Sequence, residues 1–278
     1  MTLAPLDIHT LLRRYNITAK KSLGQNFLID DHALRKIVES AEVTSEDSVL
    51  EIGAGLGSLT RYLANAAAQV VAVELDKRFL DPLQEVLVSF TNVKVIQGDI
   101  LELDPSALIA VPHYLVVANI PYYITSAVIR HLLEADIKPN RVVLTIQKEV
   151  AQRVCAVPDD MNLLALGVQV YGKPSITGKI LAGAFFPAPD VDSAVVRIDL
   201  YDQPLIPAPH IEDFFRLAKA GFGQKRKTLR NSLSAGLGWP AIKTESLLAS
   251  AGIDPQRRAE TLSMPEWGVL VEKLIESR

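Results

Sequence analysis

The sequence is poor in the residues that disulfide-stabilised and metal-binding proteins use. Its 278 residues include one cysteine, Cys155, so no disulfide can form within the chain. The five histidines are scattered, and none has a second candidate ligand at the spacing typical of metal sites. We therefore expect a cytoplasmic protein that holds no metal.

Long apolar runs and a strong net charge are missing too. No run is long enough to span a bilayer, and the N-terminal stretch lacks the charged-then-apolar layout of a signal peptide and carries an early acid, Asp7. We expect no membrane segment. The net charge of −3 argues mildly against nucleic-acid binding, unless basic residues are concentrated locally. The length and the apolar content of 49% suffice for one large domain and one small domain.

A glycine-rich turn between a predicted strand and a predicted helix organises the chain. Residues 49–57 read Val-Leu-Glu-Ile-Gly-Ala-Gly-Leu-Gly, and residues 58–64 have helical spacing. Glycines let a ligand lie against bare backbone, and the helix N-terminus offers unpaired N–H groups, as in nucleotide-like cofactor sites. The dinucleotide fingerprint requires a glycine where Ser58 stands. With Glu51 before it, the pattern instead resembles motif I of the S-adenosylmethionine-dependent methyltransferases, whose cofactor has no pyrophosphate.

Successive predicted strands end on candidate ligands. The first carries Glu51, and the next three end on Glu74, Asp99 and Asn119. Because ligands of an open parallel sheet bind outside the carboxyl ends of its strands, we expect these side chains to converge. Glu74 has the charge and geometry to accept hydrogen bonds from a ribose diol, and Asp99 can accept one from an adenine amine.

The tetrapeptide Asn119-Ile120-Pro121-Tyr122 follows the fourth predicted strand. An exocyclic amine on a base is a weak nucleophile because its lone pair is delocalised into the ring. The Asn119 side-chain oxygen and the Ile120 carbonyl can accept the two amine hydrogens and favour a pyramidal nitrogen. Pro121 stiffens the turn, and Tyr122 offers a flat face for a flipped base. The alternative is a plain proline-containing loop.

The rest of the chain predicts a mixed sheet followed by helices. Two strand-like runs, 175–181 and 194–200, indicate a hairpin that closes the sheet with one antiparallel strand. A linker punctuated by prolines follows, and the chain is helical from residue 211 onward. We predict an α/β fold with a mostly parallel, Rossmann-like sheet and a small C-terminal all-helical domain, divided as 1–201 and 202–278.

Together these motifs resemble the ribosomal RNA adenine dimethyltransferases, specifically the KsgA family, which acts on small-subunit rRNA. The resemblance covers nearly the whole chain from about residue 20 and implies a class I methyltransferase domain with S-adenosylmethionine as cofactor. The family usually has a glycine-serine-lysine segment where this chain has residues 159–164, so RNA contacts of that loop stay open. The matching stretches are residues 22–28, 51–57, 74, 98–99, 119–122, 147–150, 185–193 and 222–233.

The resemblance also implies roles for individual residues. Asn119 is expected to bridge the cofactor and the target amine, and Phe185 to stack against the target base. The expected catalytic residues are Asn119, Ile120, Pro121, Tyr122 and Phe185. The expected cofactor-binding residues are Gln25, Asn26, Leu28, Glu51, Gly53, Gly55, Glu74, Leu75, Asp99, Ile100 and Asn119.

Basic residues are concentrated in the stretch 219–230. On a helix that starts near Gln224, Arg226, Lys227 and Arg230 would share a face and could meet phosphates. A solvated helix face is the commoner role of such a run, and the family resemblance favours RNA. The expected RNA-binding residues are Lys225, Arg226, Lys227 and Arg230.

The implied activity is dimethylation of adenine N6 amines, at two adjacent adenines in a hairpin near the 3′ end of 16S rRNA. The expected partner is small-subunit rRNA within a pre-ribosomal 30S particle, met by a monomer during ribosome biogenesis. A large-subunit rRNA adenine methyltransferase of the antibiotic-resistance type is the close alternative, which the C-terminal basic pattern disfavours. Ser58 disfavours a nicotinamide oxidoreductase. A non-enzymatic ribosome-assembly role is compatible with catalysis.

Overall fold

The computed structural model describes residues 3–20 and 23–278, so Ser22, in a stretch that matches the family, lies outside the described residues. The chain divides into two compact units. The first comprises Met1–Ala151 with Pro174–Leu200, and the second Gln152–Lys173 with Tyr201–Arg278. The division into functional domains at residue 201 stays a prediction; as a structural division it omits the segment 152–173, which belongs with the C-terminal helices.

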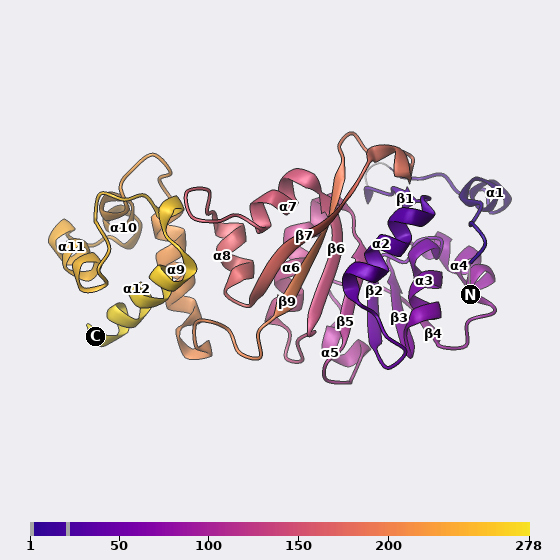
Figure 1. Ribbon diagram of the computed structural model, residues 1–278, viewed down its shortest axis with the longest axis horizontal. Helices are drawn as coiled ribbons and strands as arrows, with labels where there is room; N and C mark the ends of the chain where they lie inside the picture. The colour runs from indigo at the N-terminus through magenta and orange to yellow at the C-terminus, as the bar shows by residue number, and fades with distance from the viewer. Residues whose placement is uncertain (1–2, 21–22) are drawn as a thin grey trace. The chain divides into compact units, whose positions relative to one another are not determined.

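A seven-stranded sheet forms the centre of the first unit, within the described part of the chain (Figure 1). The strand order is β4-β3-β2-β5-β6-β9-β7, and β9 runs antiparallel to β6 while the other registered neighbours are parallel. The predicted mixed sheet is confirmed. The chain winds outward from β2 to β4 and then returns to β5, so the order reverses between β2 and β5, where open α/β sheets bind ligands. The strands are β2 Ser48–Ile52, β3 Gln69–Glu74, β4 Val93–Gln97, β5 Leu115–Asn119, β6 Arg141–Gln147, β7 Gly172–Ile180 and β9 Ser193–Leu200.

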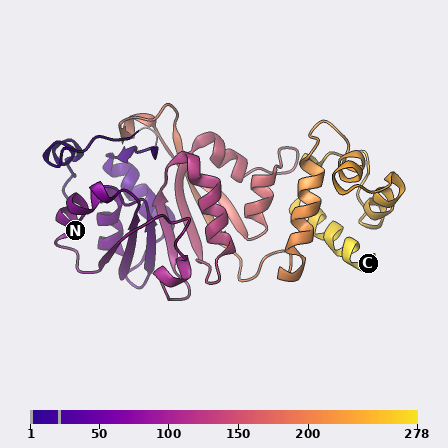
Figure 2. The same cartoon turned by 180° about the vertical axis from the view of Figure 1, so that it is seen from behind.

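Helices cover both faces of this sheet, which explains the near-continuous apolar sequence of its central strands. Helices α2 and α3 lie on one face and α6 on the other (Figures 1 and 2). On α2, Leu34, Ile37 and Ala41 recur at helical spacing and are buried against the sheet. The helices of this part are α2 Asp31–Ala41, α3 Ser58–Ala66, α4 Leu80–Leu87, α5 Pro105–Leu108 and α6 Thr125–Glu134, with short 3₁₀ turns at η2 Lys77–Phe79, η3 Tyr122–Ile124 and η4 Ala182–Ala184. Helix α7, Lys148–Val154, begins in the first unit and ends in the second.

The N-terminal segment packs beside the sheet through a small separate core. Helix α1, Ile8–Arg14, is capped by Asp7 and contributes Ile8 and Leu12 to a cluster with Phe27 and Phe79. A two-stranded ribbon then forms between β1, Phe27–Leu28, and β8, Phe185–Phe186. This pairing brings the segment around residue 26 next to the loop that follows residue 181.

The second unit is built of helices, as predicted. The buried Trp267 of α12 stacks on Phe222 of α9, with ring centroids 6.0 Å apart. Ser263 caps α12 in a capping box with Glu266. Among the described helices, none is long and apolar enough to cross a membrane. The helices are α8 Leu163–Gln169, α9 Ile211–Phe222, α10 Leu229–Leu237, α11 Ala241–Ser250 and α12 Met264–Glu276, with 3₁₀ turns at η5 Ala208–His210 and η6 Ala259–Thr261.

Candidate active site

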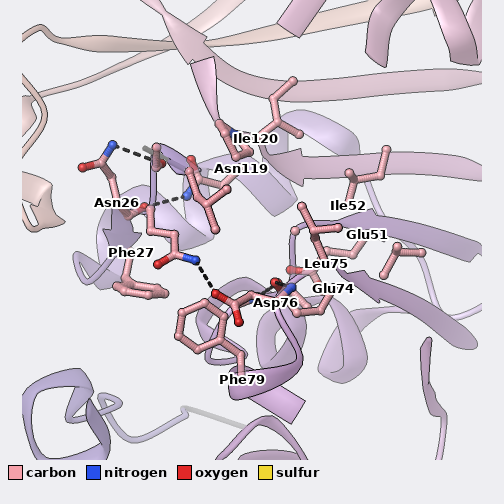
Figure 3. Close-up of a pocket in the computed structure, with 18 of the residues that line it drawn as sticks. Asn26, Phe27, Glu51, Ile52, Glu74, Leu75, Asp76, Phe79, Asn119 and Ile120 are labelled. Carbon is pink, nitrogen blue, oxygen red and sulfur yellow. Dashed lines mark hydrogen bonds between the residues drawn. The ribbon is translucent and has the colours of Figure 1, made fainter. Parts of the chain in front are cut away.

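A pocket opens at the carboxyl ends of the parallel strands, at the point where the strand order reverses (Figure 3). Its walls come from the ends of β2, β3 and β5, the residues after β4, the segment 23–28 and Phe185. The structure brings together in this pocket every residue predicted as catalytic or cofactor-binding: Gln25, Asn26, Leu28, Glu51, Gly53, Gly55, Glu74, Leu75, Asp99, Ile100, Asn119, Ile120, Pro121, Tyr122 and Phe185.

The glycine turn presents bare backbone to this pocket. Gly53, Gly55 and Gly57 have φ angles of +77°, +58° and +84°, a region that side-chain-bearing residues rarely adopt. The Gly53 N–H donates to the Val73 carbonyl at 2.8 Å, which ties the turn to β3. A Cβ added at Gly55 would lie 3.3 Å from the Phe27 ring. The sequence therefore needs glycine here for both conformation and space.

Glu74 holds the glycine turn as well as facing the pocket. Its carboxylate accepts the Gly55 N–H at 2.7 Å and the Asp76 N–H at 2.8 Å. The side chain is buried, and burial raises the pKa of Glu74 while these backbone hydrogen bonds oppose that rise. Because each carboxylate oxygen can accept more than one hydrogen bond, acceptor capacity is left for a ligand.

Glu51 is the most deeply buried acid of the pocket, with 1% of its surface exposed. Its Oε2 has no hydrogen-bond partner among the described residues. Burial raises the pKa of Glu51 to about 8, with the neighbouring Glu74 charge adding to the rise. At neutral pH this carboxyl is therefore largely protonated, and a cationic group bound beside it would favour its ionised form.

The charges around the pocket are of one sign. Glu51, Glu74, Asp76 and Asp99 line it, and no lysine or arginine does within residues 3–20 and 23–278. This donor set suits a ligand with hydroxyls, amines and positive charge better than one with phosphates. S-adenosylmethionine, with a ribose diol, an adenine amine, an ammonium group and a sulfonium, fits that description.

A second wall combines apolar surface with one acceptor. Leu75 is 46% exposed, and Ile100 is buried beside the residues that follow β4. The Leu101 N–H donates to Asp99 Oδ1 at 2.9 Å, and this turn holds the carboxylate in place. An apolar slot with an acidic acceptor at one end has the chemistry to recognise a purine that carries an exocyclic amine.

Asn119 lies at the end of β5 with its amide orientation fixed. Its Nδ2 donates to the Asn26 backbone carbonyl at 3.2 Å (Figure 3), while Asn26 Nδ2 donates to the Gly24 carbonyl at 3.3 Å. Because the Asn26 carbonyl can only accept, the NH₂ end of the Asn119 amide must face it. The Asn119 side-chain oxygen is thereby left available as an acceptor.

The two predicted aromatic residues differ in their surroundings. Tyr122 is half-buried, and its hydroxyl lies 2.6 Å from Ser193 Oγ. Burial raises the pKa of Tyr122. Phe185 reaches the pocket wall but is only 4% exposed and belongs to the core cluster that includes Leu28 and Ile180. Phe185 therefore has a packing role in addition to any contact with a base.

Several pocket residues escaped the sequence reasoning. Phe27, Asp76 and Phe79 all line the pocket, and the Phe27 and Phe79 rings meet edge to face at 5.4 Å. The position of Phe27 depends on the β1–β8 ribbon, a long-range pairing that leaves no local signal. For Asp76 the sequence does contain a local signal. This residue lies two residues after the strand-end acid Glu74 and two residues before Arg78, a cation that can pair with it.

The basic residues of the second unit are arranged differently from the prediction. Helix α9 ends at Phe222 and α10 begins at Leu229, so Arg226 and Lys227 lie in the turn between them and share no helical face with Arg230. The expectation of one basic helix was wrong. Its physical reason is that the Leu229 N–H donates to the Arg257 carbonyl at 2.6 Å, and this long-range contact sets the start of α10.

Exposure separates the four basic residues into two groups. Lys225, Arg226 and Lys227 are exposed and make no ion pair with any side chain that the structure describes. Arg230 pairs with Glu245 at 2.5 Å.

Across the described residues, no group of three or more His, Cys, Asp or Glu side chains is arranged to hold a metal ion.

Comparison with known proteins identifies the class to which this fold and pocket belong. The model of the family "Ribosomal RNA adenine dimethylase" matches residues 16–276. The chain therefore belongs to that family, as the sequence motifs predicted, and the family is one of methyltransferases, which implies a methyl-donor cofactor and an rRNA substrate.

Individual relatives agree with the family assignment. Ribosomal RNA small subunit methyltransferase A of Dehalococcoides mccartyi strain CBDB1 is 48% identical over 259 residues, which is 92% of this chain and 89% of that protein. The protein of the same name from Alkaliphilus oremlandii is 40% identical over 278 residues, covering 98% of this chain and 97% of that protein.

Solved structures share the fold. A dimethyladenosine transferase from Plasmodium falciparum has a TM-score of 0.79 and 25% identity, covering 90% of this chain and 98% of that one. The 23S rRNA methyltransferase ErmE has a TM-score of 0.74 and 29% identity, covering 90% of this chain and 100% of that one.

Proposed function

We propose that this protein transfers methyl groups from S-adenosylmethionine to the N6 amines of two adjacent adenines near the 3′ end of small-subunit rRNA, twice per amine. The observation that carries the chemistry is the Asn119 amide, whose NH₂ end is tied to Asn26 while its oxygen is left to accept. The similarity to relatives named small subunit methyltransferase A supports the choice of RNA.

The residues that would hold the cofactor fall into three groups in this proposal. Glu74 accepts from the ribose hydroxyls, and Asp99 from the adenine amine between Leu75 and Ile100. The Gly53–Gly55 backbone and Glu51 face the methionine part. When bound, S-adenosylmethionine supplies an electrophilic methyl group on a positively charged sulfur.

The remaining catalytic work is placement of the target amine. In the first transfer, the Asn119 oxygen and the Ile120 carbonyl accept the two amine hydrogens, so the nitrogen lone pair loses conjugation with the ring and points away from those acceptors. In the second transfer, the methylated amine offers its one remaining hydrogen to these acceptors. After each transfer, the methylated nitrogen loses one proton to solvent. Tyr122 and Phe185 hold the base plane. Reactions of this kind gain most of their rate from orientation, and no general base is required to start the transfer.

In this proposal the enzyme meets the RNA as a monomer, within a pre-ribosomal 30S particle in the cytoplasm. Lys225, Arg226 and Lys227 supply phosphate contacts from the exposed turn after α9. Each such contact releases counterions from the RNA backbone, so these charges increase affinity without distinguishing one base sequence from another.

Methylation assays on two substrates test the proposal. Small-subunit particles that lack adenine methylation should accept up to four methyl groups at two adenines, whereas naked large-subunit rRNA should accept none above background. A large-subunit preference would favour the alternative activity that ErmE's name describes. An Asn119→Ala variant provides the control for contaminating methyltransferases.

A further inference from the structure

One side chain of the pocket bridges two segments that lie far apart in the sequence. Gln25 Oε1 accepts the Lys20 backbone N–H at 2.7 Å, and Gln25 Nε2 donates to Asp76 Oδ2 at 3.0 Å. The Lys20 N–H fixes which end of the amide is oxygen, so the NH₂ group must face the Asp76 carboxylate. The segment 23–28 is thereby tied to the end of β3.

Asp76 is held rigidly for this contact. Arg78 donates from Nε to Asp76 Oδ1 at 2.9 Å and from Nη2 to Oδ2 at 2.5 Å, and its Nη1 reaches the Thr18 carbonyl at 3.3 Å. The Asp76 side chain is 9% exposed. The bidentate guanidinium keeps the pKa of Asp76 well below its usual range, so the acceptor stays charged at neutral pH.

Both ends of the bridge continue into groups of the proposed active site. At one end, the Asp76 N–H donates to Glu74 Oε1 at 2.8 Å, and Glu74 in turn holds the Gly55 N–H. At the other end, Gln25 is followed by Asn26, whose carbonyl accepts from Asn119 Nδ2 at 3.2 Å. Hydrogen bonds joined by short stretches of backbone thus connect the glycine turn with the Asn119 amide.

We propose that Gln25, Asp76 and Arg78 are positioning residues that fix the segment 23–28 against the pocket and so set both cofactor affinity and the orientation of Asn119. The inference rests on the proposed function, because it assigns these residues to the same reaction. In this account Gln25 acts through Asp76 and Asn26, although it also lines the pocket.

An exchange of amide and carboxylate tests this proposal. Gln25→Glu sets two carboxylates against each other and breaks the bridge, whereas Gln25→Glu combined with Asp76→Asn restores an NH₂ group facing a carboxylate in the opposite direction. The carboxylate introduced at position 25 of the double variant can still accept from the Lys20 N–H. A bridging role predicts rescue, and direct contact of Gln25 with the cofactor predicts none.

Calorimetric titration with S-adenosylmethionine is the first readout. Gln25→Glu should weaken binding roughly ten- to hundredfold, the range for a hydrogen bond to a charged group. The double variant should recover part of this loss but not all of it, because the NH₂ group introduced at position 76 also faces Arg78 Nη2, from which Asp76 Oδ2 accepts in the wild type. Single-turnover rates at saturating cofactor should fall and recover in parallel, since Asn119 is disturbed through Asn26. The rate of hydrogen exchange of the backbone amides of residues 23–28 should rise in Gln25→Glu and fall again in the double variant.

Gln69→Glu is the matched control, because Gln69 lies at the other end of β3 and donates one side-chain hydrogen bond to Ser48. It should bind cofactor as wild type does. Melting temperatures of all variants exclude global unfolding. Wild-type affinity in Gln25→Glu, or an equally weak double variant with an intact fold, overturns the proposal. Calorimetry uses no RNA, so these outcomes are independent of which RNA the enzyme methylates.

Discussion

The strand-end pocket and the basic turn after α9 both present charge, and they hold it in opposite ways. In the pocket, the buried Glu74 is fixed by backbone N–H groups, and Asp76 is fixed by the Arg78 guanidinium. In the turn, Lys225 and Arg226 are exposed and unpaired with any described side chain. Charge that must act on one atom is held rigidly, whereas charge that neutralises a polyanion needs only proximity.

The largest effect is expected where the pocket and the core share a residue. Phe185→Ala removes a ring that is 4% exposed, and such truncations cost about 3–5 kcal/mol of unfolding free energy. Urea denaturation should show this loss of unfolding free energy. A methylation assay on the same variant should show reduced turnover. Tyr122→Ala, at a half-buried position, should be less destabilising. Equal stability of Phe185→Ala and wild type would mean that the ring contributes only to the pocket.

The buried acid Glu51 should make stability depend on pH. Its pKa is raised from 4.5 to about 8 in the folded protein, so folding favours the protonated form. The stabilisation is complete below about pH 4.5 and is lost as pH rises through 8, by up to about 1.4 kcal/mol per pH unit in that window. Glu51→Gln should flatten the dependence of unfolding free energy between about pH 5 and 8. If the unfolding free energy of the two proteins changed with pH in the same way, the Glu51 carboxylate would have to be solvated and ionised in the folded protein.

The Asn119 amide should matter for the chemical step more than for folding. Asn119→Ala removes an acceptor whose hydrogen bond strengthens as the amine becomes tetrahedral, and we expect single-turnover methylation to slow roughly a hundredfold. The assay needs saturating cofactor, because loss of the Asn26 contact can also weaken cofactor binding. Rates within a few-fold of wild type would exclude this activation of the amine.

The smallest effects are expected in the basic turn. Replacement of Lys225, Arg226 and Lys227 by Gln should weaken binding of small-subunit rRNA and reduce the slope of log affinity against log salt by about one unit per lost contact. Arg230→Gln should change the slope less, because Arg230 already pairs with Glu245. Methylation of a free adenine analogue should stay unchanged. A slope identical to wild type in the triple variant would show that these charges do not meet RNA.

The two regions also differ in how far sequence alone could predict them. Parallel strands force Glu74, Asp99 and Asn119 to one edge of the sheet, so a correct strand assignment was enough to bring them together. The start of α10 depends instead on a contact between Leu229 and Arg257, which local helical spacing cannot reveal. The pairing of β1 with β8 is also a long-range contact that local sequence patterns do not reveal, so the place of Phe27 in the pocket lining was not predicted.

The pairing of β1 with β8 also has a consequence for the order in which the protein matures. Phe27 is made early in synthesis, but its partner Phe186 is made only after all the parallel strands. A nascent chain that has emerged as far as β6 carries the glycine turn and the strand-end acids, yet lacks the strand that anchors residues 27 and 28. Cofactor binding should therefore arise late in translation, close to the moment when Phe185 and Phe186 leave the exit tunnel.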